Sequence, residues 1–534
     1  MTIRAADLLA RRLHQAGCRR AFGMPGGEVL TIVDALCKAG IEFILCHHEN
    51  AGGFMSEGGH HVDGAPAILV ATVGPGVMNA VNVVANAEQD RVPLIVLSGC
   101  IDADEAETYT HQLLDHRAVL DPITKATFTL TPGAAAVQAD KAVRIAMAPR
   151  AGPVLVDVPI SVADAPVEDD SIALPPTAPG AIGADALRQA REWLEQAERP
   201  IMLAGLDAVR DRAGPTIRAF CETHSVPLVT TYKGKGLMPE GHSLCLGGAG
   251  LSPLADRHLL PLFRDADLVI LAGYDPIEMR VGWRNVWDAG TQRVIDICDA
   301  PNTHGMHAAS LEVVAPVGDT LSRLSDGVTG QETWPDDAPA MARLALREAF
   351  SAREWGPDAV IATCRDVCPP GTIATVDSGA HRILLSQMWE CEAPGLLLQS
   401  TGLCTMGCAL PLALGAKRAA PDTPVVAFMG DGGFLMVAGE LASAVALKVP
   451  VVAVVFVDAS LALIEMKQRQ RQLSNAGVDF DRLDHAAVAR AFGGRGVRVA
   501  DADALRGAME DALAHPGFTL IAAEIDRKAY DGRI

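Results

Sequence analysis

The sequence lacks long apolar runs. Its longest uninterrupted apolar stretch, VPVVAVVFV at 449–457, is far below the roughly 20 residues that a helix needs to cross a bilayer. The first 18 residues contain no continuous apolar core of the signal-peptide kind, and their pattern predicts an amphipathic helix. We therefore expect no membrane span and no export signal, and we interpret 449–457 as a buried strand.

Positive charge and closely paired cysteines are also scarce. The chain has 45 Lys and Arg against 65 Asp and Glu, a formal net charge of −20. A field of that sign repels phosphate and excludes nucleic acid or an anionic membrane as the main partner. None of the 12 cysteines stands in a Cys-x-x-Cys pair, the spacing typical of structural zinc sites. Reduced thiols fit a cytoplasmic location, which we predict for this protein.

Short β-branched runs alternate with longer helical patterns along the whole chain, as in parallel sheets with crossover helices. With 534 residues the chain also exceeds what one hydrophobic core supports. Two stretches rich in Pro, Gly and acidic residues, 162–183 and 325–340, predict interdomain linkers. The predicted fold class is α/β, with three doubly wound parallel-sheet domains. Their predicted ranges are 1–165, 184–325 and 341–534. The strand candidates are 67–74, 93–99, 200–205, 267–273, 293–298, 372–377, 424–430 and 451–458.

Residues 425–468 carry the most informative local pattern. They predict a buried strand, a GDGG turn, an amphipathic helix and a second buried strand that ends at Asp458. Gly432 and Gly433 would let backbone amides approach a phosphate at the helix start. Asp431, Asp458 and the backbone carbonyl of Ser460 offer hard oxygen ligands for Mg²⁺. A GDG sequence alone would equally fit an ordinary turn before a helix.

This block resembles the metal motif of the thiamine diphosphate-dependent enzymes, in which a GDG is followed on the next strand by Asn-Asn or Asn-Asp. Here Val457 and Asp458 occupy the paired positions, so the second ligand is a carboxylate. An Asp binds Mg²⁺ as well as an Asn does, while it adds negative charge beside a diphosphate. The resemblance thus implies thiamine diphosphate and Mg²⁺ as cofactors.

The N-terminal segments 22–30, 46–58 and 71–99 resemble the pyrimidine-binding domain of the same family. By that resemblance Glu49 hydrogen-bonds the aminopyrimidine ring and helps to remove the thiazolium C2 proton, and Pro25 contacts the cofactor. The task requires a carboxyl group that shares a proton with a ring nitrogen, which a poorly solvated setting favours. A surface or ion-paired carboxylate is the alternative interpretation of Glu49.

Two further segments resemble cofactor-binding parts of the third domain. In 400–416 Met406 matches the apolar wedge that bends the cofactor, and in 376–383 Ala380 and His381 match diphosphate contacts. A core methionine and a structural histidine are the alternatives.

The segment 110–125 resembles the acetolactate synthases and implies that Gln112 is an active-site amide; a surface Gln is the alternative. The segment 272–283 resembles the flavin-independent, catabolic synthases. The Arg-Phe-Asp-Asp-Arg motif of the flavin-binding synthases and a Gly-x-Gly-x-x-Gly fingerprint are absent from that domain, so FAD is not expected. In relatives, side chains matching Leu463, Ile464 and Lys467 line the pocket over the thiazolium, although ordinary packing would explain them equally.

The resemblance implies a carboligase that decarboxylates a 2-oxo acid, pyruvate, and joins it to a second one to give 2-acetolactate. A non-oxidative 2-oxo acid decarboxylase or a hydroxy-ketone lyase would share every cofactor residue. A catalytically inactive cofactor-binding paralogue is the alternative of another class, motivated by the Val457-Asp458 departure. In the family the site forms between subunits, so we expect a homodimer or homotetramer.

Overall fold

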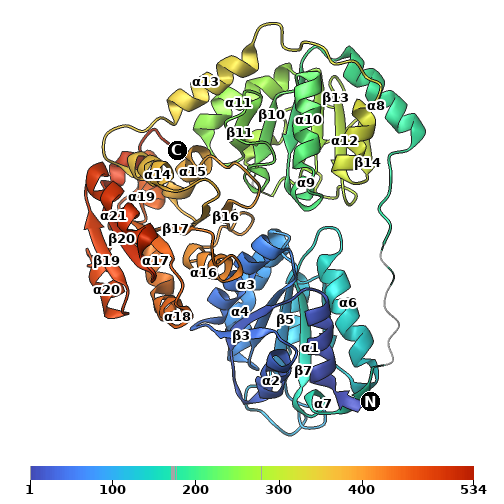
Figure 1. The fold of residues 1–534 in the computed structure, drawn as a ribbon, viewed down its shortest axis with the longest axis vertical. Helices are drawn as coiled ribbons and strands as arrows, with labels where there is room; N and C mark the ends of the chain where they lie inside the picture. Colours follow the sequence, from blue (N-terminus) through green and yellow to red (C-terminus); the bar gives the residue numbers. More distant parts are fainter. Residues whose placement is uncertain (1, 170–174, 176, 278) are drawn as a thin grey trace.

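The computed structural model describes residues 2–169, 175, 177–277 and 279–534. Three α/β domains follow one another along the chain, coloured blue to cyan, green to yellow, and orange to red in Figure 1. Each contains a six-stranded parallel sheet, which confirms the predicted fold class. Among the described residues, no helix combines the length and the apolar character that a membrane crossing requires.

The first domain has the sheet order β3-β2-β4-β5-β7-β6. Its strands are β2 (Arg20–Met24), β3 (Glu42–Leu45), β4 (Ala67–Ala71), β5 (Leu94–Cys100), β6 (Ala126–Thr129) and β7 (Val154–Pro159). Its helices are α1 (Ala5–Gln15), α2 (Leu30–Lys38), α3 (Glu49–Asp63), α4 (Pro75–Gln89), α5 (His116–Leu120), α6 (Ala135–Met147) and α7 (Ile160–Ala163). Helices α1, α2 and α6 share one core, whereas α3 and α4 pack into a second core that reaches the third domain.

The middle domain has a different sheet order, β11-β10-β9-β12-β13-β14. Its strands are β9 (Pro200–Ala204), β10 (Leu228–Thr231), β11 (Cys245–Ala249), β12 (Leu268–Ala272), β13 (Arg293–Cys298) and β14 (Leu311–Val314). Its helices are α8 (Ala184–Gln196), α9 (Leu206–Arg210), α10 (Gly214–His224), α11 (Pro253–Asp265) and α12 (Val317–Ser325). Within the segment 272–283, Glu278 lies outside the described residues.

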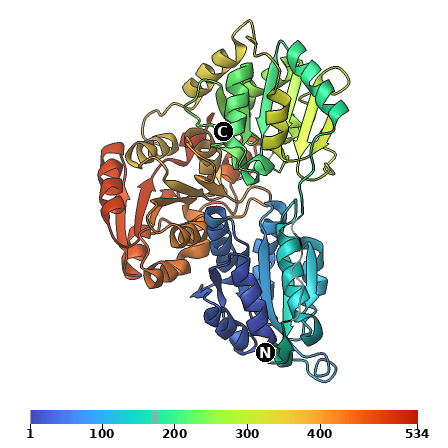
Figure 2. The same cartoon turned by 45° about the vertical axis from the view of Figure 1, so that its right-hand side comes forward.

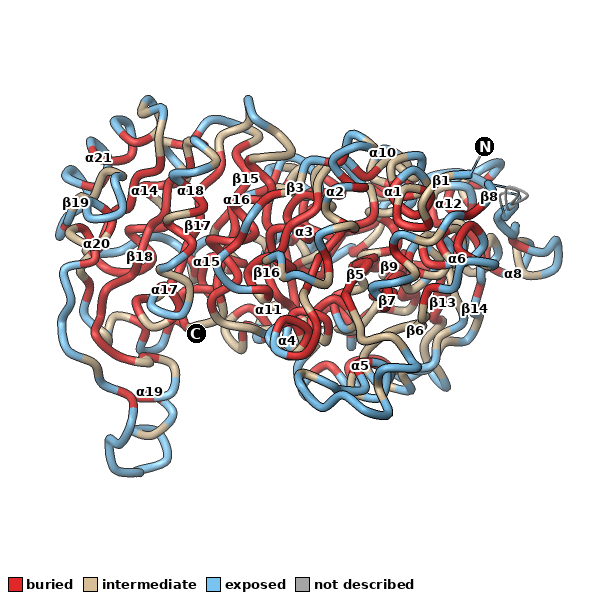
Figure 3. The backbone as a smooth tube through the Cα atoms, turned by 90° about the horizontal axis from the view of Figure 1, so that it is seen from below, coloured by how far each residue is buried: buried red, intermediate tan, exposed pale blue. Residues whose placement is uncertain are grey.

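The third domain has the sheet order β16-β15-β17-β18-β20-β19. Its strands are β15 (Ile373–Val376), β16 (Leu397–Gln399), β17 (Val425–Gly430), β18 (Val452–Val457), β19 (Arg495–Val499) and β20 (Thr519–Glu524). Its helices are α14 (Pro357–Val367), α15 (Ala380–Met388), α16 (Ala409–Ala419), α17 (Asp431–Val437), α18 (Leu441–Leu447), α19 (Ala462–Gln470), α20 (His485–Ala491) and α21 (Ala502–Ala514). Figure 3 shows β17 and β18 buried, as expected for central strands.

All eight strand candidates contain a strand. The structure differs from the sequence prediction at both predicted linkers and in the helix after the GDGG turn. The predicted linker 162–183 includes a short strand, β8 (Pro166–Glu168), which pairs antiparallel with β1 (Thr2–Arg4), and residues 170–174 and 176 of that linker lie outside the described residues. Helix α13 (Ala338–Ala349) begins before residue 341 and packs on α11 and β11 of the middle domain (Figure 1). Its buried Leu346 makes this docking favourable.

The prediction of a single amphipathic helix after the GDGG turn is wrong. The structure divides it into α17, a short 3-10 turn at Ala438–Glu440, and α18. Gly439 lies at the break, where a residue without a side chain stabilises a helix poorly.

The first and third domains pack directly on each other through α3 and α16, and Figure 2 shows the two domains in contact. Two glycines make the close approach possible. A Cβ on Gly58 would collide with the carbonyl oxygen of Leu412, and a Cβ on Gly415 would collide with that of Met55. The backbones of α3 and α16 are therefore in contact.

Candidate active site

A cavity of about 250 Å³ opens at the carboxyl edge of the third-domain sheet, where open parallel sheets bind ligands. The strands β15, β17 and β18 are neighbours, so the residues that come after them meet at this edge. The predicted residues that line the cavity are Ala380, His381, Met406, Asp431, Gly432, Gly433, Asp458, Ser460, Leu463 and Ile464. The structure thus brings together predicted residues that are up to 84 positions apart in the chain, from Ala380 to Ile464.

Asp431 and Asp458 lie side by side because β17 ends at Gly430 and β18 ends at Val457. The backbone amides of Asp458 and Ala459 donate to Oδ2 of Asp431 at 3.2 and 2.7 Å. The amide of Gly432 donates to Oδ1 of Asp431 at 2.8 Å. These bonds fix the first carboxylate, and the amide of Ser460 donates to Asp458 Oδ1 at 3.0 Å.

The two carboxylates repel each other in a poorly solvated place. Burial raises the pKa of Asp431, and burial together with the charge of Asp431 raises the pKa of Asp458 to about 8. A bound cation would remove this repulsion and favour the ionised form of both groups. Carboxylate oxygens are ligands that Mg²⁺ prefers.

Uncharged hydrogen-bonding groups lie on the same wall of the cavity. The His381 ring stacks on Phe456 with centroids 5.1 Å apart. Burial, and secondarily Arg382, lowers the pKa of His381 to about 3, so the ring is neutral. Its Nε2 atom and the hydroxyl of Ser378 are buried and have no hydrogen-bond partner among the described residues. Buried polar atoms without partners are costly, which fits a polar ligand in this cavity.

Gly433 allows the GDGG turn to pack closely on Asp377 beside the cavity. A Cβ on Gly433 would collide with the carboxylate of Asp377. Asp377 in turn accepts hydrogen bonds from the amides of Gly407 and Cys408 at 2.8 and 2.7 Å. This arrangement holds the segment that carries Met406 against the GDGG turn.

The predicted residues of the first domain come after three strands of its parallel sheet, β2 (Pro25), β3 (Glu49) and β5 (Gln112). Glu49 begins α3, is 3% exposed, and accepts from the side-chain amide of Asn79 at 3.0 Å. Gln112 has a left-handed backbone with φ of 57° and lies against Gly74. Pro25 comes directly after β2 and is exposed. The buried position of Glu49 argues against the surface interpretation of this carboxylate.

The third-domain cavity does not include these first-domain residues. Pro25, Glu49 and Gln112 are not among the described residues that line the third-domain cavity. Their part in one site with Asp431 and Asp458 therefore stays a prediction that requires a second subunit.

Sequence reasoning missed several residues of the cavity wall. Ser378 lies inside the quoted segment 376–383, so its position could have been anticipated from Ala380 and His381. Tyr530 reaches the cavity from a 3-10 turn at Arg527–Tyr530, and no sequence signal pointed to it. Lys467, by contrast, is exposed and does not line the cavity, although it shares α19 with Leu463.

Comparison with protein families assigns all three domains. Residues 3–119 match the thiamine pyrophosphate enzyme N-terminal TPP binding domain. Residues 187–324 match the central domain, and 377–523 match the C-terminal TPP binding domain. Fold and matches together define a thiamine pyrophosphate enzyme, and thiamine diphosphate is its cofactor.

Curated relatives of this chain are similar over nearly their whole length. An acetolactate synthase of Bacillus subtilis is 28% identical, with 98% of this chain and 93% of the relative covered. A catabolic acetolactate synthase of Raoultella terrigena is 27% identical, with 98% and 95% covered. A probable 2-ketoarginine decarboxylase of Pseudomonas aeruginosa is 29% identical, with 97% and 94% covered. The chain belongs to the acetolactate synthase group of thiamine diphosphate-dependent enzymes, and its class of activity is that of a carboligase or decarboxylase.

Proposed function

We propose that this enzyme decarboxylates pyruvate and joins the resulting two-carbon unit to a second pyruvate, which gives 2-acetolactate. The observation that carries the proposal is the cavity in which two adjacent carboxylates, Asp431 and Asp458, lie beside the uncharged polar groups of Ser378 and His381. Such a cavity is suited to a diphosphate bound through Mg²⁺. The similarity to synthases, one of them catabolic, supports the choice of product.

The residues of the cavity fit the cofactor group by group. Asp431, Asp458 and the carbonyl of Ser460 would hold Mg²⁺. The amide of Gly433, with Ala380 and His381, would face the diphosphate, and Gly432, whose amide already donates to Asp431, would leave room for it. Because Met406 and Leu461 also line the cavity, apolar side chains would border the rest of the cofactor.

The bound cofactor supplies an electron sink for the loss of carbon dioxide from the 2-oxo acid. Glu49 of a second subunit would share a proton with the cofactor's ring nitrogen, and its bond to Asn79 keeps the carboxyl group oriented. Met406 would support the cofactor from the cavity wall, and Gln112 would donate a hydrogen bond to the substrate carboxylate. A homodimer or homotetramer is thus part of this proposal.

The pocket decides between carbon capture and protonation. Leu463 and Ile464 line the cavity, and apolar walls that exclude water favour attack on a second 2-oxo acid. A non-oxidative 2-oxo acid decarboxylase is the second candidate, because one relative of equal similarity is described as a probable 2-ketoarginine decarboxylase.

The decisive experiment incubates purified full-length protein with pyruvate, thiamine diphosphate and Mg²⁺ and measures acetolactate and acetaldehyde. Acetolactate as the main product supports the proposal, and acetaldehyde as the main product supports the decarboxylase. A parallel screen of other 2-oxo acids identifies a different donor. Cofactor binding without turnover of any 2-oxo acid would contradict both candidates and favour an inactive paralogue.

A further inference from the structure

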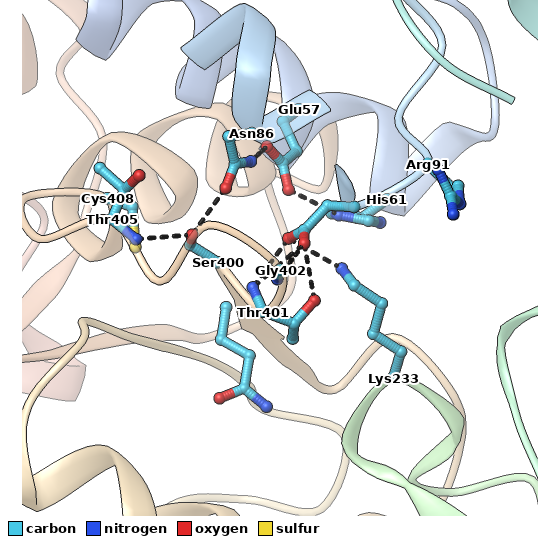
Figure 4. Close-up of polar contacts among 12 residues, drawn as sticks. Glu57, His61, Asn86, Arg91, Lys233, Ser400, Thr401, Gly402, Thr405 and Cys408 are labelled. Atoms are coloured by element: carbon cyan, nitrogen blue, oxygen red, sulfur yellow. Dashed lines mark hydrogen bonds and ion pairs between the residues drawn. The ribbon is translucent and has the colours of Figure 1, made fainter. Parts of the chain in front are cut away.

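The loop 400–406, between β16 and α16, carries Cys404 and Met406 to the cavity wall. It lies at the junction of the three domains, and Figure 4 shows its residues Ser400, Thr401 and Gly402 close to Asn86 of α4 and to Lys233 of the middle domain. The contacts at this junction are not explained by the cofactor chemistry described above.

One face of α4 holds the start of the loop. Asn82, Asn86 and Asp90 are spaced by four residues, which places them on one side of the helix and its C-terminal cap. Asn82 accepts from the hydroxyl of Thr405 at 3.1 Å, and Asn86 accepts from that of Ser400 at 2.6 Å. Ser400 also accepts from the amide of Thr405 at 2.8 Å, and this bond links the two ends of the segment 400–405.

Asp90 makes the densest set of these contacts. It accepts from the amide and hydroxyl of Thr401 at 2.9 and 2.7 Å and from the amide of Gly402 at 2.6 Å. The ammonium of Lys233 lies 3.2 Å from its carboxylate. Both side chains are almost fully buried, with 0% and 9% exposure. Breaking such a pair leaves an unpaired buried charge, which is strongly unfavourable.

The electrostatics identify Asp90 as the ionised partner. Burial alone would raise its pKa, but Lys233 and the amides of Gly402 and Thr401 outweigh burial and lower the pKa. The neighbouring Glu57, which accepts from Asn86 at 3.0 Å, has its pKa raised to about 8 by burial and by Asp90. The Asp90 carboxylate and the Lys233 ammonium therefore form an ion pair inside the junction.

We propose that Asp90 is a positioning residue that holds the 400–406 loop, that Lys233 of the middle domain supports it by pairing with its carboxylate, and that the two together set the place of Met406 in the cavity. This inference rests on the proposed function for its effect on turnover. The far end of the loop is fixed independently, because Asp377 binds the amides of Gly407 and Cys408. Met406 lies between these two anchors, so loss of the Asp90 contacts would loosen the loop on the N-terminal side of Met406 and let this side chain shift in the cavity.

The test compares Asp90→Asn and Lys233→Met with Lys235→Met in the full-length protein. Lys235 is a matched control, because it forms another buried ion pair of the middle domain, with Glu240 at 2.6 Å. We expect amide exchange in the peptide 399–408 to be faster by about 10-fold or more in the first two variants and unchanged in the control. We also expect kcat to fall by about 10- to 100-fold, with KM changed by less than about 3-fold, because misplaced groups lose rate.

Thr401 provides a milder pair of variants that keeps the buried charges intact. Thr401→Ser retains the hydroxyl donor to Asp90 and should stay within about 2-fold of the parent, whereas Thr401→Val loses it and should speed loop exchange about 5-fold. Unchanged loop exchange in Asp90→Asn and in Thr401→Val, or an equal loss of kcat in Lys235→Met, would overturn the inference. Exchange does not depend on turnover, so it reports on the loop even if pyruvate proves not to be the substrate.

Discussion

The first and third domains have the same strand order but carry opposite halves of the predicted site. If the six strands of each sheet are numbered in chain order, their spatial order across the sheet is 2-1-3-4-6-5 in both domains. In both, the helix that comes after the second strand, α3 or α16, packs against its counterpart. Yet the predicted site residues of the first domain include one buried carboxylate, Glu49, whereas those of the third include the adjacent pair of Asp431 and Asp458.

This difference shows that the shared topology creates two equivalent edges, and that a few residues decide what each edge binds. The third-domain edge has paired carboxylates and glycines, which suit a cation and a diphosphate. The first-domain edge offers one carboxylate held by an amide, which suits proton sharing with a ring nitrogen. The middle domain, with a different strand order, lies outside this comparison.

We expect the largest effect from neutralising Glu49, the carboxylate of the first-domain edge. We expect Glu49→Gln to lower kcat by roughly 10²- to 10⁴-fold, because an amide cannot exchange the proton. Calorimetric titration should show that thiamine diphosphate still binds within a few-fold. Glu88→Gln, on α4 of the same domain, serves as the control and should keep its activity. Retained turnover in Glu49→Gln would remove Glu49 from the chemistry.

The glycines of the third-domain edge offer a second test. Gly433→Ala places a methyl group against Asp377, and we expect a loss of about 1 to 3 kcal/mol in the free energy of unfolding, because an overpacked site must shift. Gly439→Ala is the matched control, since its Cβ would meet nothing within 4 Å. Urea unfolding of both variants measures the difference, and equal stability would show that the contact yields easily.

A third test uses the acidic pair. The pKa of Asp458 is raised from 3.8 to about 8, so the native chain holds a proton there that the unfolded chain releases. The stability linked to this proton is present at low pH and lost as the pH rises toward about 8. We expect Asp458→Asn to flatten this dependence in metal-free protein by about 1 kcal/mol or more. Thermal unfolding at several pH values, with and without saturating Mg²⁺, measures this pH dependence. If the stability of Asp458→Asn falls with pH as steeply as that of the parent, the expectation is contradicted.

The smallest expected effects concern α19. Leu463 lines the cavity while Lys467 on the same helix is exposed. We expect Leu463→Ala to raise the share of acetaldehyde about 2- to 5-fold, because more water reaches the cavity. Lys467→Ala should change that ratio by less than about 2-fold. Product analysis by chromatography separates the two, and a larger effect at Lys467 would show that the residue reaches the pocket in the assembled enzyme.

Much of the third-domain cavity could be predicted from the sequence because its residues come directly after strands. The runs that became β17 and β18 are continuously apolar, and a buried strand that ends in a turn fixes where the next residue lies. Asp431 and Asp458 could therefore be paired before any coordinates. The division of the helix after the turn was not predicted, since α17 and α18 share one apolar pattern and a lone Gly439 does not by itself signal a break.

Glu49 and the other predicted residues of the first domain were indicated only by the family resemblance. By itself, the sequence determined the α/β class, eight of the strands, and the positions of Asp431 and Asp458 at the third-domain sheet edge. Each of these depends on local periodicity and on the residues at the end of a strand. Only the tertiary structure decided that α13 joins the middle domain and that Tyr530 reaches the cavity. It also decided that Asp90 and Lys233 meet at Thr401. These contacts join residues that are far apart in the chain, and local pattern carries no information on which distant surfaces come together.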